Sequence, residues 1–148
     1  KIEDIKELTN FVKTEAIFAK DYNETEIEKA TDYIKNYIPT IFKSMFEEND
    51  LLFSAVCPIK TQPIEFLNPM KDSFMDKKYV VGQTLSLTSF ANICGHPAMS
   101  VPLSKIDNLP LGSMFQAPNG TDELLYQLAY QLEEAKPWKD QWPEMSYK

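Results

Sequence analysis

Hydrophobic residues recur every three or four positions over residues 2–20, which predicts an amphipathic helix. The positions are Ile5, Leu8, Val12, Ala16 and Ala19. A second helix is expected to begin near Thr25, because Thr25 and Glu28 have the spacing of a capping box. Pro39 lies inside the apolar pattern that follows and is expected to kink this helix or divide it into two.

Short apolar runs predict three strands further along the chain. Residues 51–56 are typical of a buried strand in a central sheet. Pro97 and Pro102 bracket a second apolar run, and we expect them to fix its length because proline cannot donate to a strand ladder. This run is nearly continuous in apolar residues, as in a strand covered on both faces. Residues 107–108 predict a turn, and a third strand is expected near residues 111–116.

The C-terminal part of the chain predicts one more helix. Asn119 and Gly120 indicate a turn, after which Thr121 is expected to cap the helix. The buried stripe is expected at Leu124, Leu125, Leu128, Ala129 and Leu132. Pro137 should end the helix, because the residue before proline disfavours helical geometry. Trp138 and Trp142 are expected to hold the tail against the domain.

Composition indicates an ordinary globular protein of one domain. The chain has 148 residues, of which 43% are hydrophobic and 25% charged. A net charge of -7 argues against nucleic acid as a partner, since phosphate binding needs clustered Lys and Arg. No apolar run approaches the roughly 18 residues that span a bilayer, so no membrane partner is expected. Cys57 and Cys94 form no Cys-x-x-Cys pair and no secretory signal is evident, which favours the cytoplasm.

The region around the second and third strands resembles a known family. The matching positions are Asn92, Gly95, Pro97, Ala98, Ser100 and Pro102, then Leu109, Pro110 and Gly112, then Gly120 and Leu125. In this order they resemble the C-terminal part of the amidase signature family. The segment from Leu132 to Trp138 is similar to the 6-aminohexanoate-cyclic-dimer hydrolase group of amidases. The resemblance implies an α/β fold with a mixed β-sheet covered by α-helices, and residues 1–148 as a single domain that is the C-terminal fragment of a larger amidase.

The same resemblance implies where the chemistry lies. Amidase signature enzymes hydrolyse amide bonds with a serine nucleophile, a second serine in a cis peptide and a lysine, through an acyl-enzyme. The serines lie in a Gly/Ser-rich segment, and this chain, with four glycines, has no such segment. We therefore expect no catalytic residue, cofactor or metal site here, and an inactive fragment of a parent that hydrolyses linear or cyclic small-molecule amides. Two alternatives remain open: a non-catalytic interaction module that binds a partner through an exposed sheet edge and apolar helix faces, and a fragment of the A-type subunit of an amidotransferase. A fragment cut from a larger domain is also expected to self-associate through its exposed sheet edges.

Candidate pocket residues lie in the segment before the second strand. The resemblance implies that Thr88, Ser89, Asn92, Cys94 and Gly95 line the substrate pocket of the parent, together with the loop after Val56. For Asn92 and Cys94, roles outside the pocket are favoured. Asn92 would bond its own loop backbone, as Asn does at turns, and Cys94 would be a small buried apolar residue.

Further expectations concern His96, Met114, Gln116 and residues 79–90. His96 is the single histidine and is expected to be a surface loop residue, without metal or triad partners. Met114 stands where many family members have Gln, and Gln116 is expected on the same strand face. Residues 79–90 leave two alternatives: Tyr79-Val80-Val81 favours a strand, whereas the resemblance implies a loop or a short helix.

Overall fold

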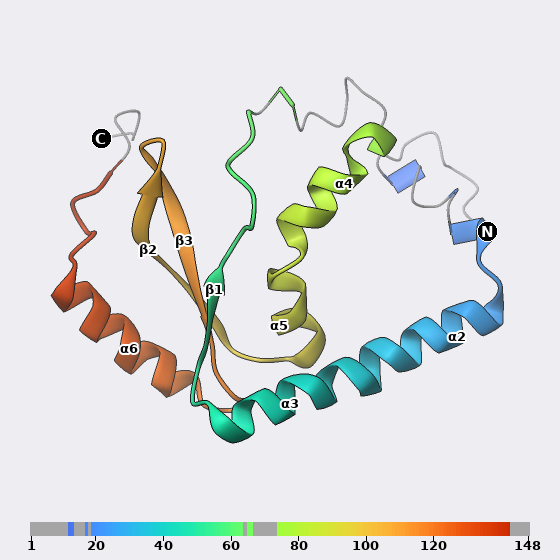
Figure 1. Ribbon diagram of the computed structural model, residues 1–148, viewed down its shortest axis with the longest axis horizontal. Coiled ribbons are helices and arrows are strands. Elements are labelled where there is room, and N and C mark those ends of the chain that lie inside the picture. Colours follow the sequence, from blue (N-terminus) through green and yellow to red (C-terminus); the bar gives the residue numbers. More distant parts are fainter. Residues whose placement is uncertain (1–11, 14–16, 18, 64, 67–73, 143–148) are drawn as a thin grey trace.

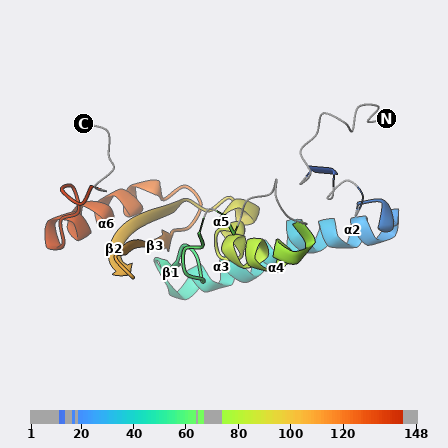
Figure 2. The ribbon, with the colours of Figure 1, turned by 90° about the horizontal axis from the view of Figure 1, so that it is seen from above.

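The computed structural model describes residues 12–13, 17, 19–63, 65–66 and 74–142, with side chains for residues 74–79 excepted. Most of the expected helix over residues 2–20 falls outside the described residues; Val12, Lys13 and Ile17 are helical, and η2 (Ala19–Asp21) is a short 3-10 turn. The α/β class is confirmed: helices flank an antiparallel three-stranded sheet (Figure 1). Turned by 90°, α6 and the helices α3–α5 lie to different sides of the strands (Figure 2).

A helical rod of three consecutive segments forms the N-terminal part of the described chain: α2 (Glu24–Asp32), η3 (Tyr33–Tyr37) and α3 (Ile38–Glu48). The predicted cap at Thr25 is wrong. Asn23 is the N-cap: its side chain accepts from the backbone N–H of Glu26 at 3.0 Å, and the Glu26 carboxylate accepts from the Asn23 backbone N–H at 2.9 Å. This is a complete capping box, two residues earlier than the one predicted.

Pro39 changes the hydrogen bonding of this rod without ending it. The five residues of η3 are π-helical, and the N–H of Ile38 donates to the carbonyl of Tyr33, five residues back. Proline lacks an N–H and its ring crowds the carbonyl of the preceding turn, so a wider turn relieves the conflict. The chain therefore stays helical from Glu24 to Glu48, with α2 and α3 separated by a π-helical segment.

The sheet has the strand order β1-β3-β2, with every described pairing antiparallel. Its strands are β1 (Leu52–Ala55), β2 (Ala98–Ile106) and β3 (Leu109–Gln116). All three predicted strands are thus confirmed, but the mixed pairing expected of the sheet does not occur among these strands. The central position belongs to β3, so β1 is an edge strand here and its Phe53 side chain is 67% exposed. The expectation of a buried first strand is wrong for this part of the chain.

The second strand is longer than its two prolines predicted. β2 continues through Pro102 to Ile106, with a shift of register between Val101 and Ser104. Proline is tolerated at a bulge or on an edge strand, because its missing N–H then costs no ladder bond. The expectation that two prolines fix the strand length is therefore wrong. Coverage on both faces is wrong as well, since Ala98 and Ser100 are exposed.

A two-residue turn joins β2 and β3, as predicted. Asp107 and Asn108 have φ values of 52° and 65°, and Ile106 pairs with Leu109 on either side of them. Positive φ at both central positions is the geometry of a type I′ hairpin turn, which Asp and Asn tolerate better than most residues.

Two helices occupy the ambiguous region: α4 (Phe74–Leu85) and α5 (Thr88–Cys94). Of the two alternatives for residues 79–90, the short helix is close to the structure and the strand is wrong. Phe42 of α3 and Phe90 of α5 pack with ring centroids 5.1 Å apart. This aromatic contact joins α5 to the long rod.

The predicted last helix is α6 (Asp122–Ala135), which packs against β2. Leu125 is buried and the other positions of the predicted stripe are half-buried. Thr121 is the N-cap residue, but its hydroxyl donates to the carbonyl of Pro118 at 2.7 Å instead of capping the helix. The predicted position of the cap is thus right and its expected hydrogen bond is wrong.

Candidate functional site

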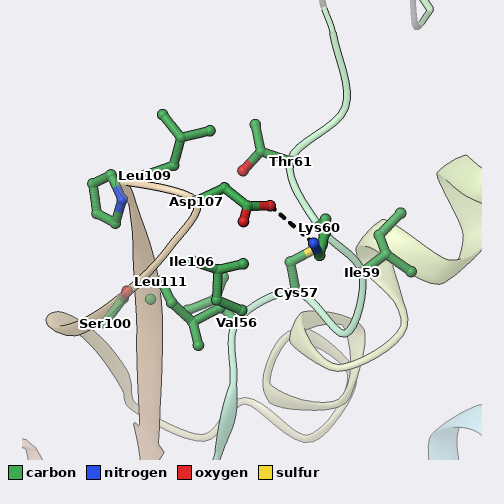
Figure 3. Close-up of a pocket in the computed structure, with 12 residues that line it drawn as sticks. Val56, Cys57, Ile59, Lys60, Thr61, Ser100, Ile106, Asp107, Leu109 and Leu111 are labelled. Atoms are coloured by element: carbon green, nitrogen blue, oxygen red, sulfur yellow. Dashed lines mark hydrogen bonds and ion pairs between the residues drawn. The ribbon is translucent and has the colours of Figure 1, made fainter.

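A cavity of about 220 Å³ lies where β1 ends, between the loop after Val56 and the tip of the β2–β3 hairpin (Figure 3). Its apolar wall includes Val56, Ile59, Ile106 and Leu111. The polar groups at its edge are Cys57, Lys60, Thr61, Ser100 and Asp107. The cavity is therefore an apolar recess with a polar rim, formed in part by the loop after Val56.

Gly112 lets β1 and its following loop approach the central strand at this cavity. The Val56 backbone N–H donates to the Gly112 carbonyl at 2.9 Å. A Cβ atom on residue 112 would lie 2.7 Å from Cγ2 of Val56 and 2.9 Å from Oγ of Ser100. Glycine is thus required by close packing from both sides, not by a left-handed backbone.

An ion pair crosses the open edge of the cavity. The Nζ atom of Lys60 lies 2.8 Å from Oδ2 of Asp107, joining the loop to the hairpin turn (Figure 3). The two side chains are 67% and 71% exposed, so solvent screens the pair and its contribution to stability is small. It links the loop after Val56 to the hairpin turn without adding much to stability.

No hydrogen bond joins a nucleophilic side chain of the cavity, Ser100 or Cys57, to a base in the described residues. Among the described residues, Ser100 has no hydrogen bond from Oγ to a histidine, lysine or carboxylate. Nucleophilic catalysis needs such a partner within hydrogen-bond reach. In the part of the chain that is described, no three His, Cys, Asp or Glu side chains gather as a metal site either.

The five predicted pocket residues share one short helix and its C-cap. Thr88 and Ser89 each donate a hydroxyl hydrogen bond to the carbonyl of Leu85, at 3.2 and 2.7 Å. Gly95 ends α5 in the left-handed conformation with φ at 70°, as expected for a residue that turns the chain tightly. The structure thus places this set on α5, whereas the cavity at the end of β1 is lined by other residues.

Asn92 and Cys94 differ in exposure and in the chemistry of their side chains. Asn92 is exposed on α5 and its side chain makes no hydrogen bond within the described residues, so the expected bond to its own loop backbone is wrong. Cys94 is half-buried, and burial raises the pKa of its thiol above the ordinary value of 9.0. A raised pKa keeps the thiol protonated at neutral pH, which is the opposite of an activated nucleophile.

His96 is not the surface residue predicted. It is half-buried in the loop between α5 and β2, and its ring meets Phe46 edge-on at a centroid distance of 4.9 Å. The ring of Phe42 is tilted against the His96 ring, with the ring centroids 5.8 Å apart. Burial lowers the pKa of His96 below the ordinary value of 6.5, because the imidazolium would lose its hydration. The short loop brings the histidine onto the aromatic face of α3, which single-sequence patterns do not reveal.

Met114 and Gln116 lie on one face of β3, as predicted from their spacing of two. They are only 4% and 5% exposed. The buried Oε1 of Gln116 has no hydrogen-bond partner among the described residues, and neither has Nδ1 of His96. Gln116 is therefore a buried polar side chain with unused hydrogen-bonding capacity, a feature that the sequence pattern alone did not identify.

Comparison with known proteins gives the class of the chain. The sequence model of the family described as Amidase matches residues 5–126, and the chain belongs to this family. The protein AmiC of Mycobacterium leprae, assigned as an amidase, is 34% identical over 97 residues, which are 63% of this chain and 20% of AmiC. The A-type subunit of the glutamyl-tRNA(Gln) amidotransferase of Clostridium kluyveri is 25% identical over 131 residues, covering 87% of this chain and 24% of the relative.

The fold agrees with this assignment. The solved structure of a 6-aminohexanoate cyclic dimer hydrolase superposes with a TM-score of 0.65 and 26% identity, over 81% of this chain and 26% of that one. The predicted resemblance to amidase signature enzymes is thereby confirmed. This chain spans about one fifth to one quarter of the length of these relatives. In the described residues, no helix reaches the length and apolarity needed to cross a membrane.

Proposed function

We propose that this chain is the C-terminal part of a larger amidase and forms one side of its substrate pocket. The observation that carries the proposal is the family match over residues 5–126, combined with described residues that pair no nucleophile with a base. The catalytic serine, the cis serine and the lysine would belong to the upstream part of the parent. There they would cleave a carbon–nitrogen bond of a small-molecule amide through an acyl-enzyme. Both cysteines are free thiols, which favours a reducing compartment such as the cytoplasm.

The pocket wall in this proposal is α5 with its C-cap. Thr88, Ser89, Asn92, Cys94 and Gly95 supply hydroxyl, amide and thiol groups within two helical turns. Asn92 is the strongest polar candidate, because its amide is exposed and free to bond a ligand. The half-buried, protonated thiol of Cys94 would add an apolar contact.

Two measurements test the proposal. The 148-residue chain by itself should hydrolyse simple amides at the background rate, whereas a longer protein that contains it should be active. Trapping a covalent acyl adduct on a serine of the short chain would contradict the assignment.

In the longer protein, Asn92→Ala should raise KM several-fold, with the free energy of unfolding unchanged because the residue is exposed. Gln127→Ala is the matched control: it removes an exposed helical amide from α6 and should leave KM unchanged. Equal KM values for wild type and Asn92→Ala would remove Asn92 from the pocket.

A second candidate function is that of the A-type subunit of an amidotransferase, which the Clostridium kluyveri relative favours. In that case the longer protein would hydrolyse glutamine, and a second protein of the complex would strongly stimulate the reaction. Steady hydrolysis of other amides by the longer protein without any partner would instead favour the stand-alone amidase.

We also propose that the isolated chain self-associates through its sheet edges. Both β1 and β2 are edge strands of the described sheet, and the exposed Phe53 on β1 adds apolar surface. Size-exclusion chromatography at two concentrations should show a shift to larger species at the higher one. A monomer at both concentrations contradicts this part of the proposal.

A further inference from the structure

A second, larger groove lies on the outer side of the β2–β3 hairpin, next to the segment that follows α6. Its volume is about 580 Å³, which is within the range of small-molecule sites. Figure 1 shows this segment turning back from α6 toward the hairpin tip. The side chain of Lys136 donates to the Leu103 carbonyl of β2, which ties the segment to the strand.

The walls of the groove are aromatic and apolar. Trp138 and Trp142 line it from the tail, and Leu109 and Pro110 line it from the start of β3. Trp138 is half-buried, as expected for a residue that holds the tail, but Trp142 is 75% exposed. An indole that remains so exposed beside a groove is available for contact with a ligand.

The charged side chains that line the groove are lysines, although the chain as a whole carries -7. Lys105 and Lys139 line it, and neither forms a salt bridge within the described residues. The nearby carboxylate of Asp107 is already paired with Lys60. The two lysines that line the groove therefore have no ion pair in the described residues, and Asp140, which follows Lys139 in the chain, is not among the residues that line it.

We propose that this groove binds a small organic anion, a carboxylate carried on an aromatic or other apolar body. The body would contact Trp138 and Trp142, and the carboxylate would accept charge-assisted hydrogen bonds from Lys105 and Lys139. The inference does not rest on the amide-hydrolysing function proposed above; the tryptophans of the groove lie beyond residues 5–126 of the family match, and Leu109 and Pro110 lie within it.

The sequence provides its own probe for this site. The chain contains two tryptophans, and both line the groove. Titration of the 148-residue chain with 4-phenylbutanoate, excited at a wavelength selective for indole, should give a saturable change in tryptophan emission. The uncharged 4-phenylbutanol has the same apolar body and should bind about tenfold more weakly, because it lacks the charge-assisted bonds.

Variants distinguish specific binding in the groove from non-specific binding to the surface. The double variant Lys105→Gln/Lys139→Gln should weaken binding of 4-phenylbutanoate about tenfold or more, and both side chains are exposed enough to be replaced without loss of fold. Lys29→Gln in α2 is the matched control and should bind as wild type does. Absence of saturable binding overturns the proposal. Equal binding of acid and alcohol, or equal loss in the Lys29 control, overturns it too.

Discussion

Replacing Gly112 with alanine should destabilise the protein by local overpacking at the end of β1. The added Cβ would lie 2.7 Å from Cγ2 of Val56, 2.9 Å from Oγ of Ser100 and 3.1 Å from Cβ of Val56. Val56 is β-branched and restricted at χ1, so it cannot simply rotate away. The strand must therefore shift, or the loop after Val56 must move outward.

Two opposing effects determine the change in the free energy of unfolding of Gly112→Ala. Overpacking of a well-packed site costs about 1–3 kcal/mol. Alanine also restricts the unfolded chain, which returns about 0.4–1 kcal/mol at a position whose backbone it can adopt. Gly112 has no positive φ, so this gain applies. We expect a net loss of about 1–2 kcal/mol in the free energy of unfolding.

Urea unfolding followed by far-UV circular dichroism measures this loss as a change of midpoint. Gly82→Ala in α4 is the matched control, because a Cβ there meets nothing within 4 Å. It should stabilise the protein by about 0.5–1 kcal/mol, since alanine is the better helix former. If Gly112→Ala stabilises the protein as Gly82→Ala does, the contact argument is refuted.

A double-mutant cycle identifies the contact itself. Val56→Ala removes the Cγ2 atom that the new Cβ would meet. In the Val56→Ala background, Gly112→Ala should therefore cost less than in the wild type, with a coupling of about 0.5–2 kcal/mol. Strict additivity of the two changes would locate the strain elsewhere.

Three further predictions concern other parts of the fold. Asn23→Ala should lower the free energy of unfolding by about 1 kcal/mol, measured in urea, since it removes the N-cap hydrogen bond. Thr25→Ala should leave it almost unchanged. The opposite result would identify Thr25 as the cap. Burial lowers the pKa of His96, so the unfolded state binds more protons below about pH 6.5 and stability should fall as pH drops. Between pH 7.5 and 5, the free energy of unfolding of the variant His96→Gln should therefore fall less than that of the wild type. An equal fall in both proteins would contradict a contribution from His96. Gln116→Met should leave stability equal or raise it by up to about 1 kcal/mol, because Oε1 has no partner in the described chain; a loss of 2 kcal/mol would indicate a bond to a group outside it.

Local sequence signals determined much of this fold. The two-residue turn at Asp107 and Asn108, the end of α6 before Pro137 and the alternation of Met114 and Gln116 all follow from interactions within a few residues. Such features can be predicted from the sequence because turn conformation and side-chain periodicity depend on residues close together in the chain. The motif residues from Asn92 to Leu125 also indicated the amidase family, which the family match confirms.

Tertiary structure decided the features that depend on distant neighbours. Pro102 is accommodated because a bulge on an edge strand needs no N–H there, and strand order is not visible in the sequence. His96 is half-buried because α3, about fifty residues earlier in the chain, packs Phe42 and Phe46 against its ring. The groove beside Trp138 and Trp142 likewise exists only because the tail folds back along the hairpin. Burial, pKa and cavities are properties of contacts between segments far apart in the chain, so periodicity along one segment could not determine them.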